Sequence, residues 1–250
     1  MLSGNGEGLN IDAMELTGAL AVVTGATEGI GRAIAFQLGS AGAKVAICAR
    51  TAGNVKLTLA DLQAAGIDAV GMPCDVSDPK AVDAFATFVT KERGAPQVLV
   101  NNAGIGRFHP IEELSVADWD ATMEVNVRSL FLVTRAFLPA MKRARTGTIV
   151  NIASLAGRNG FEGGTAYCSS KHAVLGFSKA LMFEVRKHDI RVVAVCPGSV
   201  ATPFQDKQTR MRPNRDRVLT AEDVAHTVHA TLVLPARAMV SELDIRPTNP

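Results

Sequence analysis

Residues 19–31 read ALAVVTGATEGIG, a short apolar run that passes directly into a glycine-rich turn. The apolar run predicts a buried β-strand, and the helical pattern that follows predicts a helix beginning at the turn. Gly25, Gly29 and Gly31 let the backbone approach a ligand closely, and the free amides of a helix N-terminus attract negative charge. The stretch therefore predicts a phosphate-binding turn in the first βα unit of an α/β fold.

The rest of the chain continues this alternation of short apolar runs and longer amphipathic segments. The apolar runs are residues 19–23, 45–49, 69–73, 98–100, 148–152 and 192–195. The helix-like segments are residues 30–41, 56–65, 80–91, 117–143, 165–187 and 221–234. Apolar strands separated by helices are typical of a parallel sheet covered on both faces. We predict a single-domain, doubly wound, Rossmann-type α/β fold over residues 15–250, preceded by a flexible leader of residues 1–14.

The composition excludes several classes of protein. The 250 residues are 47% hydrophobic and 20% charged, which is typical of a globular protein with a sizeable core. A net charge of +2 and an aromatic content of 5% argue against a nucleic-acid-binding protein. The leader lacks the basic and apolar segments of a signal peptide, and no apolar run approaches the ~20 residues that span a membrane. We expect a cytoplasmic protein with no nucleic-acid or membrane partner.

Tyr167 and Lys171 stand four residues apart in the sequence YCSSK, so on a helix they share one face. An ammonium group beside a phenol favours the phenolate and lowers a pKa that is ordinarily about 10. One lysine rarely supplies the roughly 4 kcal/mol needed to lower it by about three units, so a second positive charge is expected nearby. The pair is a candidate acid or base, although such a pair is more often an ordinary surface contact.

Four motifs resemble those of the short-chain dehydrogenase/reductase family. Residues 24–31 match its TGxxxGIG motif, residues 101–104 its NNAG motif, residues 167–171 its YxxxK motif and residues 197–198 its PG motif. Asn126 and Ser154 fall where the family keeps its other two catalytic residues. The matches follow the family order from about residue 18 to residue 202. Within the family, the chain resembles the 3-oxoacyl-carrier-protein reductase-like members most.

The resemblance implies hydride transfer between a nicotinamide and a carbonyl or secondary alcohol carbon. It implies that Tyr167 exchanges a proton with the substrate oxygen, while Lys171 lowers the tyrosine pKa and holds the nicotinamide ribose. Ser154 would hydrogen-bond the substrate oxygen, and Asn126 would hold a water that connects Lys171 to solvent. The predicted cofactor-binding residues are Gly25, Thr27, Glu28, Gly29, Ile30, Gly31, Arg50, Asp75, Val76, Asn102, Ala103, Gly104, Tyr167, Lys171, Pro197, Gly198, Val200 and Thr202.

The end of the second predicted strand distinguishes the two nicotinamide cofactors. The sequence Ala49-Arg50-Thr51 holds no carboxylate for a free ribose 2′-hydroxyl, whereas Arg50 with Thr51 suits a 2′-phosphate. Arg32, just after the glycine turn, is a further candidate for the phosphate. Glu28 is an opposing signal, because many NADP-dependent relatives carry a basic residue there. We predict NADP(H) in preference to NAD(H).

The sequence leaves the substrate open. The basic stretch 207–217 suits an acidic partner such as a carrier protein, or a carboxylate or phosphate on a small substrate, and is equally consistent with a solvated loop. Residues 242–250 depart from the glycine-bearing end of 3-oxoacyl reductases and resemble the branch that handles hydroxy acids and small alcohols. The wide apolar faces of residues 117–143 and 165–187 resemble the helices that pack against a second subunit in this family, so we expect a homotetramer or homodimer.

Three other functions remain as alternatives. One is an NAD-dependent hydroxy-acid or small-alcohol dehydrogenase, and another is a dehydratase or epimerase that uses the cofactor transiently. The third is a non-catalytic nucleotide sensor on the same fold, which the presence of both Tyr167 and Lys171 disfavours. His226 and His229 lie three residues apart on a predicted helix without a third ligand in nearby sequence, so no metal site is predicted.

Overall fold

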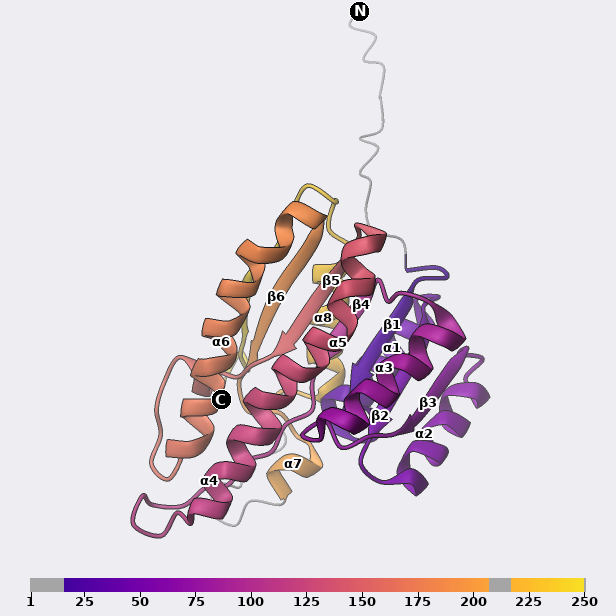
Figure 1. Ribbon diagram of the computed structural model, residues 1–250. Helices are drawn as coiled ribbons and strands as arrows, with labels where there is room; N and C mark the ends of the chain where they lie inside the picture. Colours follow the sequence, from indigo (N-terminus) through magenta and orange to yellow (C-terminus); the bar gives the residue numbers. More distant parts are fainter. Residues whose placement is uncertain (1–15, 207–216, 250) are drawn as a thin grey trace, which may run out of the picture.

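A computed structural model describes residues 16–206 and 217–249. Seven parallel strands form one sheet in the order β3-β2-β1-β4-β5-β6-β7 (Figure 1). The strands are β1 (Leu20–Thr24), β2 (Lys44–Ala49), β3 (Ala69–Pro73), β4 (Val98–Asn101), β5 (Gly147–Ile152), β6 (Ile190–Pro197) and β7 (Glu242–Ile245). The predicted doubly wound α/β fold is confirmed.

Helices cover both faces of this sheet (Figure 1). The covering helices are α1 (Gly29–Ser40), α2 (Ala52–Ala64), α3 (Pro79–Arg93), α5 (Ser129–Ala144), α6 (Thr165–Val185) and α8 (Ala221–Leu232). The short helices α4 (Val116–Met123) and α7 (Pro203–Asp206) lie beyond one end of the sheet (Figure 1). One core cluster joins α1, α2 and α8 to the sheet through residues such as Ile34, Leu62 and Val228. The other joins α3, α5 and α6 through Phe85, Phe137 and Leu181. The structure therefore has three layers, with the sheet between two sets of helices.

Local sequence signals set several helix ends. The Asp78 side chain caps α3 by accepting from Lys80 N, with Pro79 at the first helical position, and Gly94 ends the helix at φ +89°. Thr220 and Asp223 form a reciprocal capping box at the start of α8. Within residues 16–206 and 217–249, every helix is too short or too polar to span a lipid bilayer.

The structure differs from the sequence predictions in several elements, among them helix α7, which was not predicted. The helix predicted over residues 117–143 is interrupted by a π-helical turn, Glu124–Arg128, which separates α4 from α5. Strand β7 and the 3₁₀ turn Leu155–Gly157 were not predicted. The predicted leader and most of the basic stretch, residues 207–216, lie outside the described part of the chain.

The strand order places a crevice at the carboxyl ends of β1 and β4. The chain runs outward from β1 to β2 and β3 on one side, then crosses to β4, β5, β6 and β7 on the other. The loops that follow β1 and β4 therefore diverge, and ligands bind at such a switch point in open α/β sheets. The glycine turn after β1 and the NNAG motif at the end of β4 meet there.

Helix α2 provides a matched test of the core. Leu62 is fully buried against the sheet, whereas Leu57 on the same helix is 67% exposed. Leu62→Ala is expected to lower the free energy of unfolding by about 2–5 kcal/mol, because it opens a cavity in a packed core. Leu57→Ala should change it by less than about 0.5 kcal/mol. Chemical denaturation of both variants measures the difference, and equal losses would contradict the packing described here.

Candidate active site

A cavity of about 540 Å³ lies at the carboxyl ends of the central strands, within the range of small-molecule sites. Every predicted cofactor-binding residue lines it except Gly31. Ser154, Tyr167 and Lys171 line the same cavity, whereas Asn126 lies behind its wall. The structure thus brings the residues of all four sequence motifs to one site.

The glycine turn adopts a backbone that side chains disfavour. Gly25 has φ +63° and Gly29 has φ +54°, both in the left-handed region. Gly31 meets a steric limit instead, because a Cβ there would lie 2.3 Å from Asn102 Nδ2 and 2.4 Å from the Gly25 carbonyl oxygen. Gly31 therefore allows the glycine turn to pack against Asn102, and Gly31 itself does not line the cavity.

Asn102 fastens the glycine turn to the end of β4. Its Nδ2 donates to the carbonyl oxygens of Thr24 at 3.0 Å and Gly25 at 3.1 Å. The Thr24 hydroxyl oxygen accepts from the backbone amides of Asn102 at 3.1 Å and Ala103 at 3.2 Å. Both side-chain hydrogens of Asn102 are used within the protein, so the residue shapes the turn while its neighbours Ala103 and Gly104 complete the wall.

The glycine turn and helix α1 fit the phosphates of a dinucleotide. Glu28 occupies the N-cap of α1, and its side chain makes no capping hydrogen bond there. The first amides of this 12-residue helix therefore lack a side-chain cap at the point where Gly29 and Ile30 line the cavity. A helix N-terminus of this kind favours a phosphate through its amides and its dipole.

Arg50 and Asp75 line the cavity beyond the ends of β2 and β3. Burial acts to raise the pKa of Asp75, but hydrogen bonds from the Ser77 hydroxyl and amide, helped by the charge of Arg50, hold that pKa below its usual value. Arg32 does not line the cavity; it pairs with Asp61 at 2.9 Å and lies over the Phe36 ring. Among the described lining residues, Arg50 is therefore the basic side chain that this end of the cavity offers to a ribose phosphate.

Tyr167 projects from α6 into a group of aromatic rings. Its ring lies 5.4 Å from that of Phe108 and 5.8 Å from that of Phe204, and Phe161 packs edge-on against Phe108. Burial raises the pKa of Tyr167 to about 12, although a hydrogen bond with Ser154 opposes the change. In the chain by itself the phenol is therefore protonated at neutral pH and able to donate.

Lys171 holds a buried ammonium group. Its Nζ donates to the Ile152 carbonyl oxygen at 2.9 Å and lies 5.7 Å from the centre of the Tyr167 ring. Burial lowers the pKa of Lys171 to about 8. The sequence predicted that this charge lowers the tyrosine pKa, whereas within the chain burial raises the pKa of Tyr167.

Ser154 combines a structural contact with a place in the cavity wall. It is the N-cap of the 3₁₀ turn Leu155–Gly157 and accepts from Ala156 N at 3.1 Å. Its hydroxyl donates to the Pro197 carbonyl oxygen at 3.5 Å, a long and weak hydrogen bond. The turn-capping role that sequence alone could not separate from catalysis is present, and the hydroxyl proton remains available to a ligand.

Asn126 sits in the π-helical turn. Its Oδ1 accepts from Ile105 N at 2.8 Å, and its Nδ2 donates to the Ile105 carbonyl oxygen at 2.8 Å and to Ser170 Oγ at 2.9 Å. Its side-chain hydrogens are therefore committed to the loop after β4 and to α6. The resemblance implies that Asn126 holds a water, and this stays a prediction. The side-chain N–H groups of Asn126 are not available to that water, because both donate within the protein.

Sequence reasoning missed the aromatic wall. Phe108 and Phe161 come from two separate loops and Phe204 from the short helix α7, and all three line the cavity beside Tyr167. Gly106 and Gly164 make room for them, because a Cβ on Gly106 would lie 2.8 Å from Phe204 and one on Gly164 would lie 2.6 Å from Phe161. The glycines that precede or follow these phenylalanines in the sequence were the available signal, but only the fold shows that the two loops and α7 converge.

The family model for short chain dehydrogenases matches residues 19–213. The chain belongs to the short-chain dehydrogenase family. The predicted family and the predicted oxidoreductase class are confirmed.

Similar family members extend over most of the chain. A putative ketoacyl reductase of Streptomyces coelicolor is 43% identical over 187 residues, covering 74% of this chain and 72% of its own. A metagenomic short-chain oxidoreductase solved with NADP is 39% identical, with a TM-score of 0.83 over 95% of this chain and 100% of its own. A variant of actinorhodin polyketide ketoreductase solved with NADPH is 35% identical, with a TM-score of 0.85 over 94% of this chain and 98% of its own.

The buried Lys171 predicts a pH-dependent stability. Below about pH 8 the folded chain carries a buried charge, and from there to about pH 10.5 the unfolded chain alone keeps the proton, so Lys171 makes stability rise with pH in that window. Lys171→Met should raise the free energy of unfolding at pH 7 by about 1–3 kcal/mol, allowing for the lost hydrogen bond to Ile152. The gain should shrink by pH 10.

Denaturation of wild type, Lys171→Met and the exposed Lys56→Met at pH 7 and pH 10 measures this effect. Lys56→Met should show no comparable gain at either pH. A destabilised Lys171→Met protein at pH 7 would mean that the ammonium group is well solvated in the fold.

Proposed function

We propose that this chain is an NADP(H)-dependent reductase of ketones whose carbonyl carries apolar groups. The observation that carries the proposal is the continuous cavity that joins the uncapped N-terminus of α1 and Arg50 to the side chains of Tyr167, Ser154 and Lys171. The two similar solved structures that contain NADP or NADPH support the choice of cofactor. The reduced nicotinamide, when bound, supplies the hydride.

The residues of the chain then handle the carbonyl oxygen. Tyr167, protonated at neutral pH, donates its proton at Oη to the oxygen as negative charge develops there. Ser154 donates a hydrogen bond to the same oxygen, exchanging its weak contact with Pro197 for a stronger one. Lys171 uses one hydrogen for Ile152 and keeps the others for the ribose side and the Tyr167 side of the cavity. Asn126 holds the loop after β4, and with it Gly104, in place.

The cavity wall indicates the class of substrate. The side chains around Tyr167 are mainly apolar, among them Ile105, Phe108, Leu155, Phe161 and Phe204. Among the described lining residues, the charged side chains other than Lys171 are Glu28, Arg50 and Asp75, which belong to the glycine turn and the ends of β2 and β3. A carboxylate next to the carbonyl would be desolvated there with Lys171 as its single described counter-charge. This favours an apolar ketone or a 3-oxoacyl thioester over a hydroxy acid.

We further propose a homodimer or homotetramer that works in the cytoplasm. Phe131 on α5 is 46% exposed and Phe183 on α6 is 61% exposed, each beneath an arginine, Arg135 and Arg186 respectively. Large exposed aromatic side chains on neighbouring helices are typical of a contact surface. This agrees with the subunit packing that the family resemblance implies for these two helices.

The cofactor preference is tested by Arg50→Met. Loss of a charge-assisted contact to the 2′-phosphate should weaken NADPH binding by roughly 10- to 100-fold and leave NADH binding within about twofold. The matched control is Arg32→Met, which removes an arginine paired with Asp61 outside the cavity. Titration of each protein with both nucleotides, followed by energy transfer from protein fluorescence to the nicotinamide, gives the affinities. Parallel losses for NADPH and NADH would remove Arg50 from the phosphate site.

The proton donor is tested by Tyr167→Phe. We expect the rate of NADPH oxidation with a ketone to fall by roughly 10²- to 10⁴-fold, because the proton donor is lost, while NADPH affinity stays within about twofold. The neighbouring Cys168→Ala is the control and should retain activity. The assay compares aryl ketones and a 3-oxoacyl thioester with 2-oxo acids. Tight NADPH binding without turnover of any carbonyl by the wild type would support the nucleotide-sensor alternative.

A further inference from the structure

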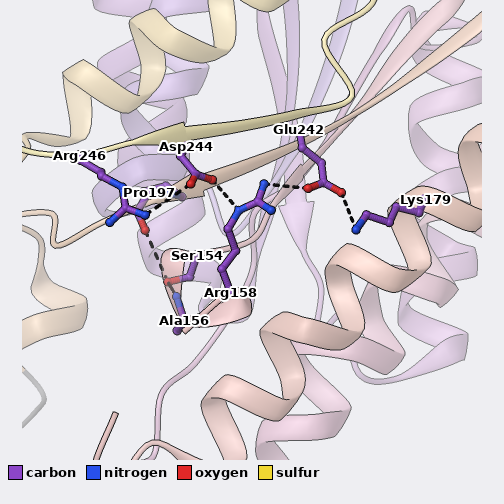
Figure 2. Close-up of polar contacts among 8 residues, drawn as sticks. All are labelled: Ser154, Ala156, Arg158, Lys179, Pro197, Glu242, Asp244 and Arg246. Atoms are coloured by element: carbon purple, nitrogen blue, oxygen red, sulfur yellow. Dashed lines mark hydrogen bonds and ion pairs between the residues drawn. The ribbon is translucent and has the colours of Figure 1, made fainter. Parts of the chain in front are cut away.

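An ion-pair network joins strand β7 to the turn that carries Ser154. Figure 2 shows the Arg158 guanidinium between two carboxylates of β7: its Nε donates to Asp244 Oδ1 at 2.6 Å, and its terminal nitrogen donates to Glu242 Oε2 at 2.7 Å. Arg246 approaches the other oxygen of Asp244 at 3.4 Å, and Lys179 approaches Glu242 Oε1 at 3.2 Å. Alternate residues of a strand share one face, so both carboxylates point the same way.

Arg158 is attached to the turn whose other end is Ser154. The 3₁₀ turn Leu155–Gly157 begins at Ser154 and ends at Arg158, whose amide donates to the Leu155 carbonyl oxygen at 2.9 Å. Ser154 itself has one ordinary hydrogen bond within the turn, one weak hydrogen bond to Pro197 and the hydrogen bond with Tyr167 described above. The side chain with strong contacts to the sheet is therefore at the far end of the turn.

Glu242 connects this turn to the helix that carries Tyr167 and Lys171. Its two oxygens bind different partners, Arg158 on the turn and Lys179 on α6. The turn also packs directly on α6, since a Cβ on Gly157 would lie 2.7 Å from the Lys171 carbonyl oxygen. One carboxylate on β7 therefore spans the two elements that present Ser154 and Tyr167 to the cavity.

The ion-pair network around Arg158 can fix the orientation of its side chains. The Arg158 side chain is 32% exposed and that of Glu242 is 17% exposed, so solvent screens these pairs less than most surface pairs. Isolated surface ion pairs contribute little, whereas a two-pronged arginine within a network of several charges also fixes orientation. Strand β7 is already paired with β6 from Ala194↔Glu242 to Pro197↔Ile245, so the strand does not depend on these side chains for its place in the sheet.

We propose that Arg158, held by Glu242 and Asp244, is a positioning residue that sets the place of Ser154 Oγ relative to Tyr167. The inference rests on the proposed ketone reduction, because Ser154 acts on the substrate oxygen in that reaction. It assigns a role to the C-terminal strand, where the sequence departs from the glycine-bearing ending of the 3-oxoacyl reductases.

The test is a double-mutant cycle with Arg158→Met and Ser154→Ala. Arg158→Met should lower kcat by roughly 10- to 100-fold, as expected for a small displacement of a catalytic group, and leave the KM for NADPH within about twofold. In the Ser154→Ala background the same substitution should have little further effect, because the group that it positions is already absent. Arg158→Lys, which keeps one of the two contacts, should restore part of kcat.

Arg145→Met is the matched control, since it breaks the Arg145–Asp189 pair at 2.8 Å, beyond the opposite end of β5. It should leave kcat unchanged. Glu242→Gln, nearly identical in shape, serves as a second variant if Arg158→Met folds poorly, and it should lower kcat in the same Ser154-dependent way. Multiplicative losses in the double variant, or a lower melting temperature with unchanged kcat, would overturn the proposal. A wild-type protein that reduces no ketone would contradict the proposed function instead.

Discussion

The site depends on the hydrogen bonds of the Asn102 and Thr24 side chains, which join the carboxyl ends of the paired strands β1 and β4. The chain leaves β1 toward β2 on one side of the sheet and leaves β4 toward β5 on the other, so the loops after these two strands diverge. The amide of Asn102 fixes the carbonyl groups of the glycine turn, which in turn fixes the start of α1 and the open side of the crevice. Gly31 is required at the contact because any side chain there would displace Asn102. The NNAG motif and the glycine motif are thus hydrogen-bonded to each other and together shape the turn after β1.

The reactive groups occupy an environment that disfavours charge. Burial lowers the pKa of Lys171 and raises that of Tyr167, so each is shifted toward its neutral form. A phenol that keeps its proton is suited to donating it to a developing alkoxide, which agrees with carbonyl reduction. The Lys171 ammonium group donates to one carbonyl oxygen, and its pKa is about 8. A charge placed beside it would therefore change its protonation at mildly alkaline pH. The proposed function thus uses an ammonium group whose burial at neutral pH is expected to lower the stability of the fold.

Much of the fold was predictable from residue patterns, because strands buried on both faces are apolar along their whole length. The predicted run at residues 148–152 falls within β5 (Gly147–Ile152), which is buried along its whole length. Strand β7 was missed because its four residues, Glu242 to Ile245, alternate polar and apolar at the edge of the sheet, too short a pattern to separate from a loop. The motif residues were brought to one cavity as expected. Gly31 lies outside the lining of the cavity. Phe108, Phe161 and Phe204 were not predicted, since their place depends on how two loops and α7, distant in sequence, converge.

The π-helical turn between α4 and α5 changes how the chain tolerates insertion and deletion. In a π turn the backbone hydrogen bond spans five residues, as in the bond from Ser129 N to Glu124 O, so one more residue is accommodated than an α-helix would hold. The residues of α5 are therefore out of phase with those of α4 by one position, about 100° of rotation. Deleting a single residue here would restore an unbroken helix and turn Leu132, Val133 and Phe137 away from the core. The π-helical turn that contains Asn126 thus also determines which face of α5 is turned toward the core.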